Sequence, residues 1–421
     1  MNHKADCCSD GGHDAPSLPL EAARERILGA LAPVAGVQRV ALGAALGRVL
    51  ARPVHAGVAV PAHDNSAMDG YAVRSADLGV AGGELRVAGR VLAGEAWSQP
   101  LEPGTCLRIM TGAPIPEGAD TVVMQEHVEV LEADRARFPA GVQPGANVRA
   151  AGEDLSAGAE ALGAGHRLRP QEIGVIGSLG IPEVWVRRRP TVAFFSTGDE
   201  LRSAGEILAP GAIYDSNRHM LAAALRRLGV EIHDMGVVGD DFSALKAAFE
   251  EAGSVADALV TTGGVSVGEA DHVKEAIEAT GSVDLWRIAM RPGRPLAFGR
   301  VGGATFFGLP GNPVSVAATF YQVVQPALRR MMGESGPLMP VLLPAVAATA
   351  MKKRSGRSEF QRGIMEQQAD GSVQVRPTGA QGSGMLTSMV KANCLIALEE
   401  DREGVAAGET VRVQPLEGLQ L

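Results

Sequence analysis

The sequence predicts a multidomain protein of the α/β plus β class, with a central domain of βαβ units, a β-rich inserted domain and a C-terminal β-barrel. Three observations predict this class. A chain of 421 residues is longer than one hydrophobic core usually organises. Between about residues 189 and 337, apolar strands alternate with helices, which is typical of a mostly parallel sheet covered on both faces. On either side of this region, short β-like runs alternate with Gly and Pro turns.

Composition and charge narrow the class of protein. Hydrophobic residues make up 46% of the chain and charged residues 21%, so the domains can form cores and intrinsic disorder is not expected. The formal net charge is −9 and no long basic run occurs, so we expect no nucleic-acid partner. The chain has no stretch of about 18 apolar residues and its N-terminus lacks a signal-peptide core. We therefore expect a cytoplasmic protein without a membrane partner.

The N-terminal residues 1–17 are predicted to form a disordered tail. Cys7 and Cys8, together with His3 and His13, could form a metal-binding tract. Adjacent cysteines are not the spacing of a common zinc site, so a tail with incidental ligands is the favoured interpretation. The whole chain has 4 cysteines, too few for a disulfide scaffold.

Residues 18–54 and 155–188 are predicted to form a helical linker domain. The first segment carries apolar residues at helical spacing, and a second apolar run, Val40–Leu50, follows. Leu168–Leu179 is predicted to be an apolar helix that opens with a proline and packs back against the end of the first segment. This return makes residues 55–154 an insertion, and their short β-like runs indicate a β-rich domain.

Residues 189–337 are predicted to form the central α/β domain, and residues 338–421 a small C-terminal barrel. Asn217 and Asp241 could each cap a helix, and a long helix, Val314–Met332, follows the last central strand. The central strands are expected at Thr191–Phe195, Val230–Val238, Ala258–Val260, Leu285–Ile288, Leu296–Phe298 and Thr305–Leu309. The barrel strands are expected at Val341–Ala345, Val373–Pro377, Cys394–Leu398 and Thr410–Gln414.

Four loops follow strands of the central domain: Ser196–Glu200, Val238–Asp241, Thr261–Asp271 and Leu309–Ser315. Ligands of open α/β sheets bind beyond the carboxyl ends of the strands, so we expect these loops to converge. They would gather the acids Asp199, Glu200, Asp240, Asp241, Glu269 and Asp271. Such a cluster is costly without a cation, and Mg²⁺ bridging to a phosphate needs only one or two carboxylates.

The acids also have simpler interpretations. One of Asp240 and Asp241 could do no more than cap a helix. Asp199 and Glu200 could form a solvated turn, and Glu269 could be a surface residue. Asp271 is favoured as functional because it closely follows the glycine turn.

Glycines and arginines of the central domain favour an anionic ligand. Gly263 and Gly264 would let backbone N–H groups approach a ligand closely. Arg291 and Arg294 stand in one Pro/Gly loop, and guanidinium forks suit tetrahedral oxyanions, although two solvent-exposed arginines would show the same spacing. The segment PGNPVS at 310–315 opens a helix that either offers N–H groups to an anion or is simply stiffened by proline.

The inserted domain carries polar turns of its own. Asp64, Asn65 and Asp69 lie in a short loop before a strand, where a plain turn is the alternative. The segments IMTGAPIP at 109–116 and RAAGEDLSAG at 149–158 also place polar groups at Gly turns. Each of these signals is weak alone.

Side by side, these motifs resemble the molybdopterin molybdenumtransferase family, the bacterial relatives of the gephyrin E domain. The resemblance covers roughly residues 18–421. Its motifs are DNSAMDGYAVR at 64–74, RIMTGAPIPEGAD at 108–120, GEDLSAG at 152–158, FSTGDEL at 195–201, TTGGVSVGEADHV at 261–273, PGRPLAFG at 292–299 and GLPGNPVS at 308–315. So many motifs in order make a chance match very improbable.

The resemblance implies a reaction and an assembly. Adenylylated molybdopterin and molybdate would be the substrates, molybdenum would be inserted at the dithiolene with release of AMP, and Mg²⁺ would assist. The central domain would bind molybdopterin, and an elongated homodimer would bring the inserted domain to the active site of the partner chain. A molybdopterin adenylyltransferase and molybdoenzyme-maturation proteins could be further partners.

Position by position, the resemblance also implies site residues. Catalytic roles fall on Asp69, Thr111, Asp154, Glu200, Asp240 and Asp271, of which Glu200, Asp240 and Asp271 would contact the metal. Substrate binding falls on Arg149, Gly263, Gly264, Ser266, Pro310, Pro313 and Ser315. Molybdate contacts fall on Arg291, Arg294, Arg362 and Ser383.

Departures from the family pattern and two alternative functions accompany the resemblance. Family members usually have lysine where this chain has Arg287, Arg291 and Arg294, and arginine replaces a point charge by a bidentate fork. The alternatives are an adenylyltransferase that makes the activated pterin from ATP, and a non-catalytic gephyrin-like scaffold. The β-rich insertion and the C-terminal domain argue against the first, and the intact set of acids argues against the second.

Overall fold

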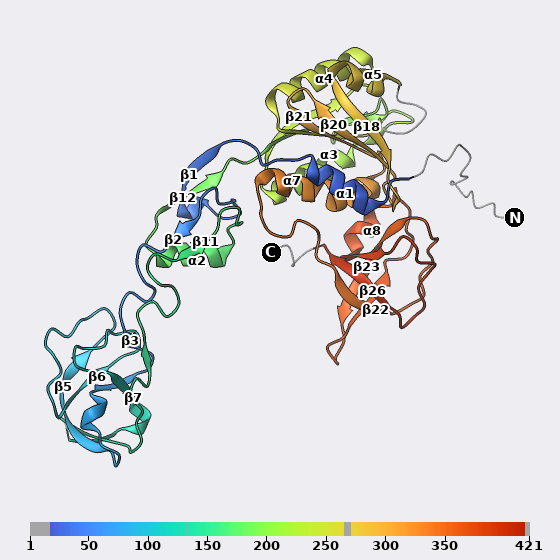
Figure 1. Cartoon of the computed structure of the whole chain (residues 1–421). Coiled ribbons are helices and arrows are strands. Elements are labelled where there is room, and N and C mark those ends of the chain that lie inside the picture. The colour runs from blue at the N-terminus through green and yellow to red at the C-terminus, as the bar shows by residue number, and fades with distance from the viewer. Residues whose placement is uncertain (1–16, 133, 265–270, 417–421) are drawn as a thin grey trace.

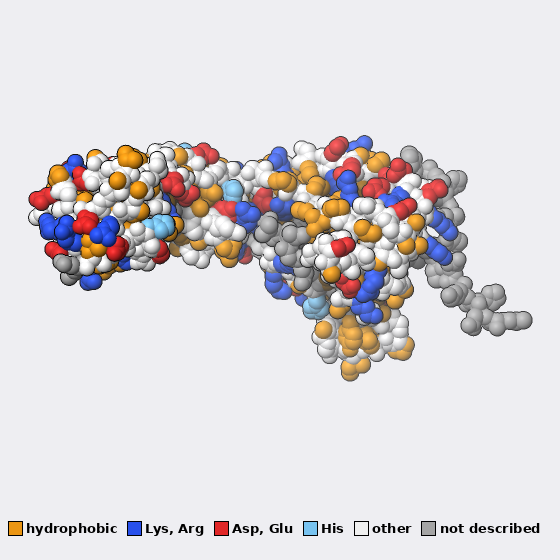
Figure 2. Space-filling view, turned by 90° about the horizontal axis from the view of Figure 1, so that it is seen from below, with side chains coloured by type: hydrophobic (Ala, Val, Ile, Leu, Met, Phe, Trp, Pro, Cys, Tyr) orange, Lys and Arg blue, Asp and Glu red, His pale blue; other side chains and the backbone are white. Residues whose placement is uncertain are grey.

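The computed structural model describes residues 17–132, 134–264 and 271–416. In the elongated molecule the α/β domain and the C-terminal barrel lie side by side (Figure 1). An arm leads from the α/β domain to the inserted domain, which stands at the far end of the molecule. Figure 2 shows acidic and basic side chains interspersed along this length.

The α/β domain is built on one six-stranded sheet. Its strands are β13 (Thr191–Thr197), β16 (Glu231–Val238), β17 (Ala258–Thr262), β18 (Gly281–Arg287), β20 (Pro295–Val301) and β21 (Ala304–Leu309). Their order is β16-β13-β17-β21-β20-β18; the first four pair in parallel, and β20 and β18 are antiparallel at one edge. The central strands β13 and β17 are buried along nearly their whole length, as expected for strands covered on both faces. The predicted mostly parallel sheet is confirmed.

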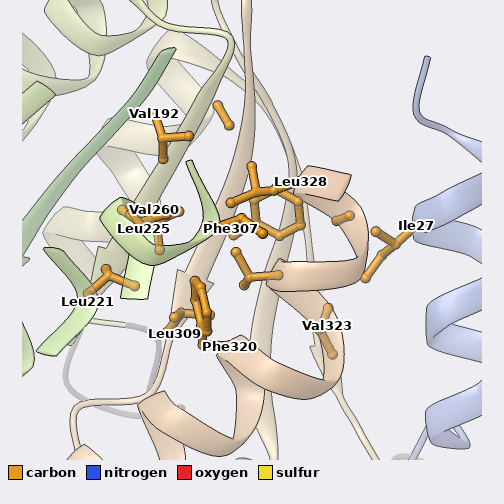
Figure 3. Packing of buried hydrophobic residues seen from close by; sticks show 14 of the residues in the cluster. Ile27, Val192, Leu221, Leu225, Val260, Phe307, Leu309, Phe320, Val323 and Leu328 are labelled. Carbon is orange, nitrogen blue, oxygen red and sulfur yellow. The ribbon is translucent and has the colours of Figure 1, made fainter. Parts of the chain in front are cut away.

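Helices cover both faces of this sheet, as predicted. They are α1 (Leu20–Gly29), α3 (Ser216–Leu228), α4 (Phe242–Val255), α5 (Asp271–Thr280), α6 (Pro313–Thr319) and α7 (Gln325–Met332). A π-helical segment, Phe320–Val324, joins α6 to α7, so the predicted long helix is continuous. Figure 3 shows one core, in which Leu225 of α3, Phe307 of β21 and Ile27 of α1 are buried together. Within the described ranges, no helix is both long and apolar enough to cross a membrane.

Two acids fix the start of the helices that follow β13 and β16. Asp241 caps α4 by accepting a 3.0 Å hydrogen bond from the N–H of Ala244, as predicted. The cap of α3 is Asp215, whose carboxylate accepts a 3.0 Å bond from the N–H of Arg218. The prediction that Asn217 caps this helix is therefore wrong by two positions, and its amide is free for a different contact.

The arm consists of short antiparallel pairs and one helix. β1 (Val37–Ala41) pairs with β12 (Glu183–Arg187), and β2 (Val54–His55) pairs with β11 (Glu160–Leu162). The predicted apolar helix is α2 (Pro170–Ser178). Its Ile176 is buried in one cluster with Leu50 and Val54, so the predicted return of the chain onto the first segment is confirmed.

The prediction that residues 18–54 are helical is wrong after α1. Gly36 adopts a φ of 109°, and the chain then enters strand β1 and a short 3₁₀ turn, Leu42–Ala44. The strand partner β12 lies far along the sequence, so local periodicity could not reveal it. α1 itself packs into the core of the α/β domain and not into the arm.

The inserted domain holds a second six-stranded sheet with hydrophobic clusters on both faces. Its strands are β4 (Gly70–Val73), β5 (Gly83–Val91), β6 (Thr105–Ile109), β7 (Thr121–Met124), β8 (Glu129–Glu132) and β9 (Arg135–Phe138), in the order β7-β4-β6-β5-β9-β8. A separate short pair joins β3 (Asn65–Ser66) to β10 (Val148–Arg149). The prediction of β-rich structure is confirmed.

The C-terminal domain is a closed barrel. Its strands are β22 (Leu343–Ala347), β23 (Ser358–Gln367), β24 (Val373–Pro377), β25 (Cys394–Leu398) and β26 (Thr410–Pro415), with α8 (Leu386–Lys391) between β24 and β25. The order β23-β24-β22-β26-β25 closes because β25 also pairs with β23. β23 is the one barrel strand that the sequence did not predict. It also pairs with β19 (Met290–Arg291), which attaches the barrel to the α/β domain.

Candidate active site

The loops at the carboxyl edge of the α/β sheet contact one another. The hydroxyl of Thr197 donates a hydrogen bond to the carboxylate of Asp240, so the loops after β13 and β16 touch. The N–H of Gly263 donates to the carbonyl of Leu309 at 3.2 Å, which joins the loops after β17 and β21. The amide of Asn217 donates to the carbonyl of Gly311 at 2.6 Å. The predicted convergence is confirmed for the described residues.

Asp240 and Asp241 are adjacent but have different environments. Asp241 is exposed and caps α4, so the simpler interpretation holds for this residue. Asp240 is half-buried, its carboxylate accepts from Thr197, and its N–H donates to the carboxylate of Asp199 at 3.2 Å. Among the described acids of these loops, Asp240 is therefore the one held at the meeting point of the loops. Thr197 was missed from the sequence, where only its place beside a glycine turn hinted at a role.

Glu200 lies across the backbone of its own turn. A Cβ added at Gly198 would lie 2.6 Å from a carboxylate oxygen of Glu200, and the φ of Gly198 is 151°. A side chain at this glycine would therefore displace Glu200. Asp199 and Glu200 are both exposed, which leaves their carboxylates accessible to solvent and to a ligand.

The described acids suit a cation that takes most of its ligands from elsewhere. No three described Asp, Glu, His or Cys residues are grouped closely enough to enclose a metal ion. Mg²⁺ commonly binds through one or two carboxylates and completes its shell with water and substrate phosphates. The half-buried carboxylate of Asp240 with the exposed Asp199 beside it fits this chemistry.

The glycine turn after β17 makes a close backbone approach. Gly263 and Gly264 have φ values of 93° and 67°, and a Cβ at Gly263 would lie 2.4 Å from the carbonyl oxygen of Thr197. Only glycine fits there without moving the backbone. Ser266 and Glu269 lie outside the described residues. Asp271 begins α5, but its side chain also lies outside the described part.

The start of α6 is tied to the barrel. Asn312 precedes the helix, Pro313 is its first residue, and Ser315 is only 5% exposed. The N–H of Val314 donates to the carbonyl of Ser383 at 3.0 Å. One of the N–H groups predicted to be offered to an anion is therefore already used by the protein. Pro310, directly before this segment, is buried.

The loop Met290–Pro295, with the sequence MRPGRP, contains two arginines that have different surroundings. The side chain of Arg291 is 58% exposed and lies 3.9 Å from the buried carboxylate of Glu359. Arg294 is half-buried, reaches the hydroxyl of Ser17 at 3.5 Å, and has a buried Nε without a partner. A Cβ at the intervening Gly293 would lie 2.5 Å from the hydroxyl oxygen of Thr319, so this loop presses against the helix that begins at α6.

Arg362 on β23 is a buried guanidinium beside this loop. Arg362 is only 1% exposed. Its Nε donates to the hydroxyl of Ser388 at 3.0 Å, and its Nη2 donates to the carbonyl of Gly382 at 3.0 Å. Burial lowers the pKa of Arg362; Glu359 opposes this shift, and the positive charge of Arg291 adds to it. Ser383 is half-buried in the same turn. The arginine and Ser383 therefore meet where the barrel touches α6; the supporting Ser388 was missed from the sequence.

A second polar cluster lies in the inserted domain, where the three predicted turns come together. The carboxylate of Asp69 accepts 2.8 Å hydrogen bonds from both the N–H and the hydroxyl of Thr111. Arg149 pairs with Asn65 through strands β10 and β3, and Asp154 follows closely, with its N–H bonded to the carbonyl of Val60 at 3.0 Å. Asp69, Thr111, Arg149 and Asp154 are all exposed. In one chain this cluster stands at the opposite end of the arm from the α/β domain (Figure 1).

Replacing Thr111 by alanine should raise the pKa of Asp69 part of the way to its ordinary value. The backbone and hydroxyl hydrogen bonds of Thr111 lower this pKa, in that order, and the substitution removes only the second. Because the pKa of Asp69 is lowered in the folded state, the ionised carboxylate and its Thr111 hydrogen bonds stabilise the fold at neutral pH. This contribution to the free energy of unfolding is lost as pH falls through the folded-state pKa. NMR titration of the Asp69 carboxyl carbon checks the shift, and an unchanged pKa would show that the hydroxyl does not hold the carboxylate.

Comparison with protein families matches nearly the whole chain. Residues 18–180 match the MoeA N-terminal region (domain I and II), residues 193–330 a probable molybdopterin binding domain, and residues 344–416 the MoeA C-terminal region (domain IV). A molybdopterin molybdenumtransferase of Haemophilus influenzae is 42% identical over 402 residues, covering 96% of this chain and 99% of the relative. The chain belongs to the molybdopterin molybdenumtransferase family. The predicted resemblance is therefore confirmed, and the family is one of transferases.

Other family members agree over similar lengths. Molybdopterin molybdenumtransferase 2 of Mycobacterium tuberculosis is 38% identical over 387 residues, which is 90% of this chain and 94% of the relative. Among solved structures, the molybdopterin biosynthesis moeA protein of Pyrococcus horikoshii OT3 has a TM-score of 0.83 at 30% identity and covers 95% of this chain and 100% of its own. The multidomain family fold, with its molybdopterin-binding-like α/β domain and C-terminal barrel, is thus the fold of this chain.

Proposed function

We propose that this chain inserts molybdenum from molybdate into adenylylated molybdopterin and releases AMP, with assistance from Mg²⁺. The full-length similarity to proteins named molybdopterin molybdenumtransferase supports insertion of molybdenum into molybdopterin. The observation that carries the proposal is that hydrogen bonds between the loops bring two chemistries to one region of the molecule, and we place the substrate cleft there. Asp240 offers a hard oxygen donor at the sheet edge, and Arg362 offers a buried guanidinium where α6 meets the barrel.

The residues of the cleft divide according to the charges of the two substrates. Asp240, with Glu200 and Asp271, would hold Mg²⁺, which when bound would neutralise the charge of the phosphates. The Gly263–Gly264 turn, Pro310, Pro313 and the Ser266 and Ser315 hydroxyls would bind the nucleotide-capped pterin. Arg291, Arg294, Arg362 and Ser383 would hold molybdate, since guanidinium forks match tetrahedral oxyanions. Cleavage adds one water across the pyrophosphate and leaves AMP and the pterin phosphate.

We further propose that two chains form a homodimer in which the inserted domain of one completes the cleft of the other. Asp69, Thr111, Arg149 and Asp154 support this arrangement because they are exposed and stand far from the cleft of their own chain. The Thr111 hydrogen bonds hold Asp69 ionised, as a group facing a metal or a donor requires. We also propose that the protein is cytoplasmic. Its partners would be a molybdopterin adenylyltransferase and molybdoenzyme-maturation proteins.

The test is a reaction with purified protein, adenylylated molybdopterin, molybdate and Mg²⁺. We expect AMP to be released in proportion to molybdenum inserted, and release to depend on both molybdate and Mg²⁺. A parallel incubation of the protein with ATP and free molybdopterin tests for the alternative adenylyltransferase activity. Consumption of ATP without molybdate-dependent AMP release would assign the chain to the adenylyltransferase reaction and overturn the proposal.

A further inference from the structure

A cavity of about 680 Å³ opens where the barrel faces the MRPGRP loop. Barrel residues around Met351–Arg354 and Gly404–Ala406 form most of its wall, and Arg291 of the α/β domain forms the remainder. Its charged lining residues are Arg291, Lys352, Lys353, Arg354, Glu403 and Glu409. Basic side chains therefore outnumber acidic ones in this cavity, although the chain as a whole has a net charge of −9.

The acids of the cavity already have partners. Glu409 pairs with Arg402 at 2.7 Å, and Glu403 accepts a 3.1 Å hydrogen bond from the hydroxyl of Ser355. Lys353 is buried and its ammonium donates to three backbone carbonyls, which makes it a structural group of the wall.

Lys352 and Arg354 differ from these groups in exposure and in pairing. Both are exposed, and within the described ranges neither forms a salt bridge. Their charges are therefore available to an anion that enters from solvent. The cavity is far larger than one tetrahedral oxyanion, so it suits a hydrated anion better than a desolvated one.

Arg291 links this cavity to the residues proposed to hold molybdate. Arg291 lines the cavity and also lies 3.9 Å from Glu359, which is three residues before Arg362 on β23. The buried amide of Gln361 bridges the two sides, donating to the carbonyl of Lys352 at 2.9 Å and to Glu359 at 3.0 Å. An anion at Lys352 or Arg354 would thus have Arg291 as its next cation and Arg362 beyond it.

We propose that this cavity is a cationic vestibule that captures tetrahedral oxyanion dianions, of which molybdate is the relevant one, and supplies them to Arg291. The inference rests on the proposed function and adds to it a second, outer anion site formed by Lys352 and Arg354. The physical reason is electrostatic focusing: an acidic protein repels a dianion at long range, and a local positive cavity offsets that repulsion at the entrance. Such a site binds weakly and is sensitive to salt because its charges stay hydrated.

The test compares the full-length Lys352→Ala/Arg354→Ala double variant with the wild-type protein. At low ionic strength, kcat/KM for molybdate should fall about three- to tenfold, and the difference should shrink in high salt. The rate at saturating molybdate should be unchanged, because neither residue contacts the reacting groups. The charge-reversing variant Lys352→Glu/Arg354→Glu should show a larger fall in kcat/KM for molybdate. Lys246→Ala, which removes one exposed charge on α4, is the control and should behave like the wild type.

A binding measurement gives a readout that does not depend on turnover. Calorimetry with molybdate alone should show weaker binding to the double variant, and the difference should disappear at high ionic strength. Unchanged kcat/KM and unchanged molybdate binding in both double variants would overturn the vestibule. Failure of the wild type to release AMP at any molybdate concentration would instead overturn the proposed function, so the two failures are distinguishable.

Discussion

Replacing Asp240 by alanine is expected to lower the rate of AMP release about 100- to 1,000-fold without unfolding the protein. Asp240 is the half-buried acid at the meeting point of the loops, and the hydroxyl of Thr197 orients it. Removing a preorganised charge that acts on the reacting phosphates lowers kcat more than it weakens substrate binding. Removing the carboxylate costs the fold little, because Asp240 neither caps a helix nor forms a salt bridge with a described residue.

Single-turnover assays at saturating substrates measure this loss. Thr197→Val should cause a smaller loss, because the carboxylate remains but is no longer held. Asp284→Asn is the matched control: it removes an exposed carboxylate from β18, at the opposite edge of the sheet from β16. If Asp240→Ala kept wild-type kcat, the cleft at the carboxyl edge of the sheet would not be the site of the chemistry.

Replacing Arg362 by leucine should raise the KM for molybdate about 30-fold, which corresponds to a loss of about 2 kcal/mol in binding free energy. The guanidinium is buried at 1% exposure and is held by Ser388 and Gly382, so it is preorganised to present its charge. The substitution also leaves the carbonyl of Gly382 without that donor. We therefore expect the free energy of unfolding to fall by about 2 kcal/mol as well.

Two variants separate the loss of molybdate binding from the loss of stability. Arg362→Lys keeps a charge and should recover part of the molybdate affinity, although it cannot reproduce the two-sided hydrogen bonding. Arg376→Ala removes an exposed barrel arginine paired with Glu366 and should leave molybdate kinetics unchanged. Urea unfolding and molybdate kinetics on the same samples provide the measurement. A leucine variant with lower stability but wild-type KM would make Arg362 purely structural.

Much of the fold follows from local patterns in the sequence. The apolar run of β13 and the Asp241 cap each depend on neighbouring residues, and each was predicted. β1 was not, because its apolar residues can follow a helical or an extended pattern until the distant β12 selects the strand. At β1, pairing with the distant strand β12 therefore outweighed the local helical pattern.

The candidate site was predictable in its loops and less so in its supporting contacts. The rule that ligands bind at the carboxyl ends of parallel strands placed Asp240 and the glycine turn at the same edge of the sheet. The resemblance alone pointed to Arg362, because a lone arginine in a strand gives no local signal. The Thr197 hydroxyl, the Asn217 amide and the Ser388 hydroxyl act through contacts between distant segments, which no local pattern encodes.

The central claim is that chemistry takes place in the α/β cleft of one chain, completed by the inserted domain of a second chain. Mixed dimers test it most directly. Chains carrying Asp69→Ala and chains carrying Asp240→Ala, with different affinity tags, are co-expressed and purified as mixed dimers. One of the two sites in such a dimer would then have both aspartates, whereas neither site of either parent would.

The measurement is molybdate-dependent AMP release per dimer, with each parental homodimer as the control. The account predicts that both parents are nearly inactive and that the mixed dimer recovers about half the wild-type rate. A mixed dimer no more active than its parents would place Asp69 and Asp240 in the same chain's site or outside any shared site, and would contradict the account.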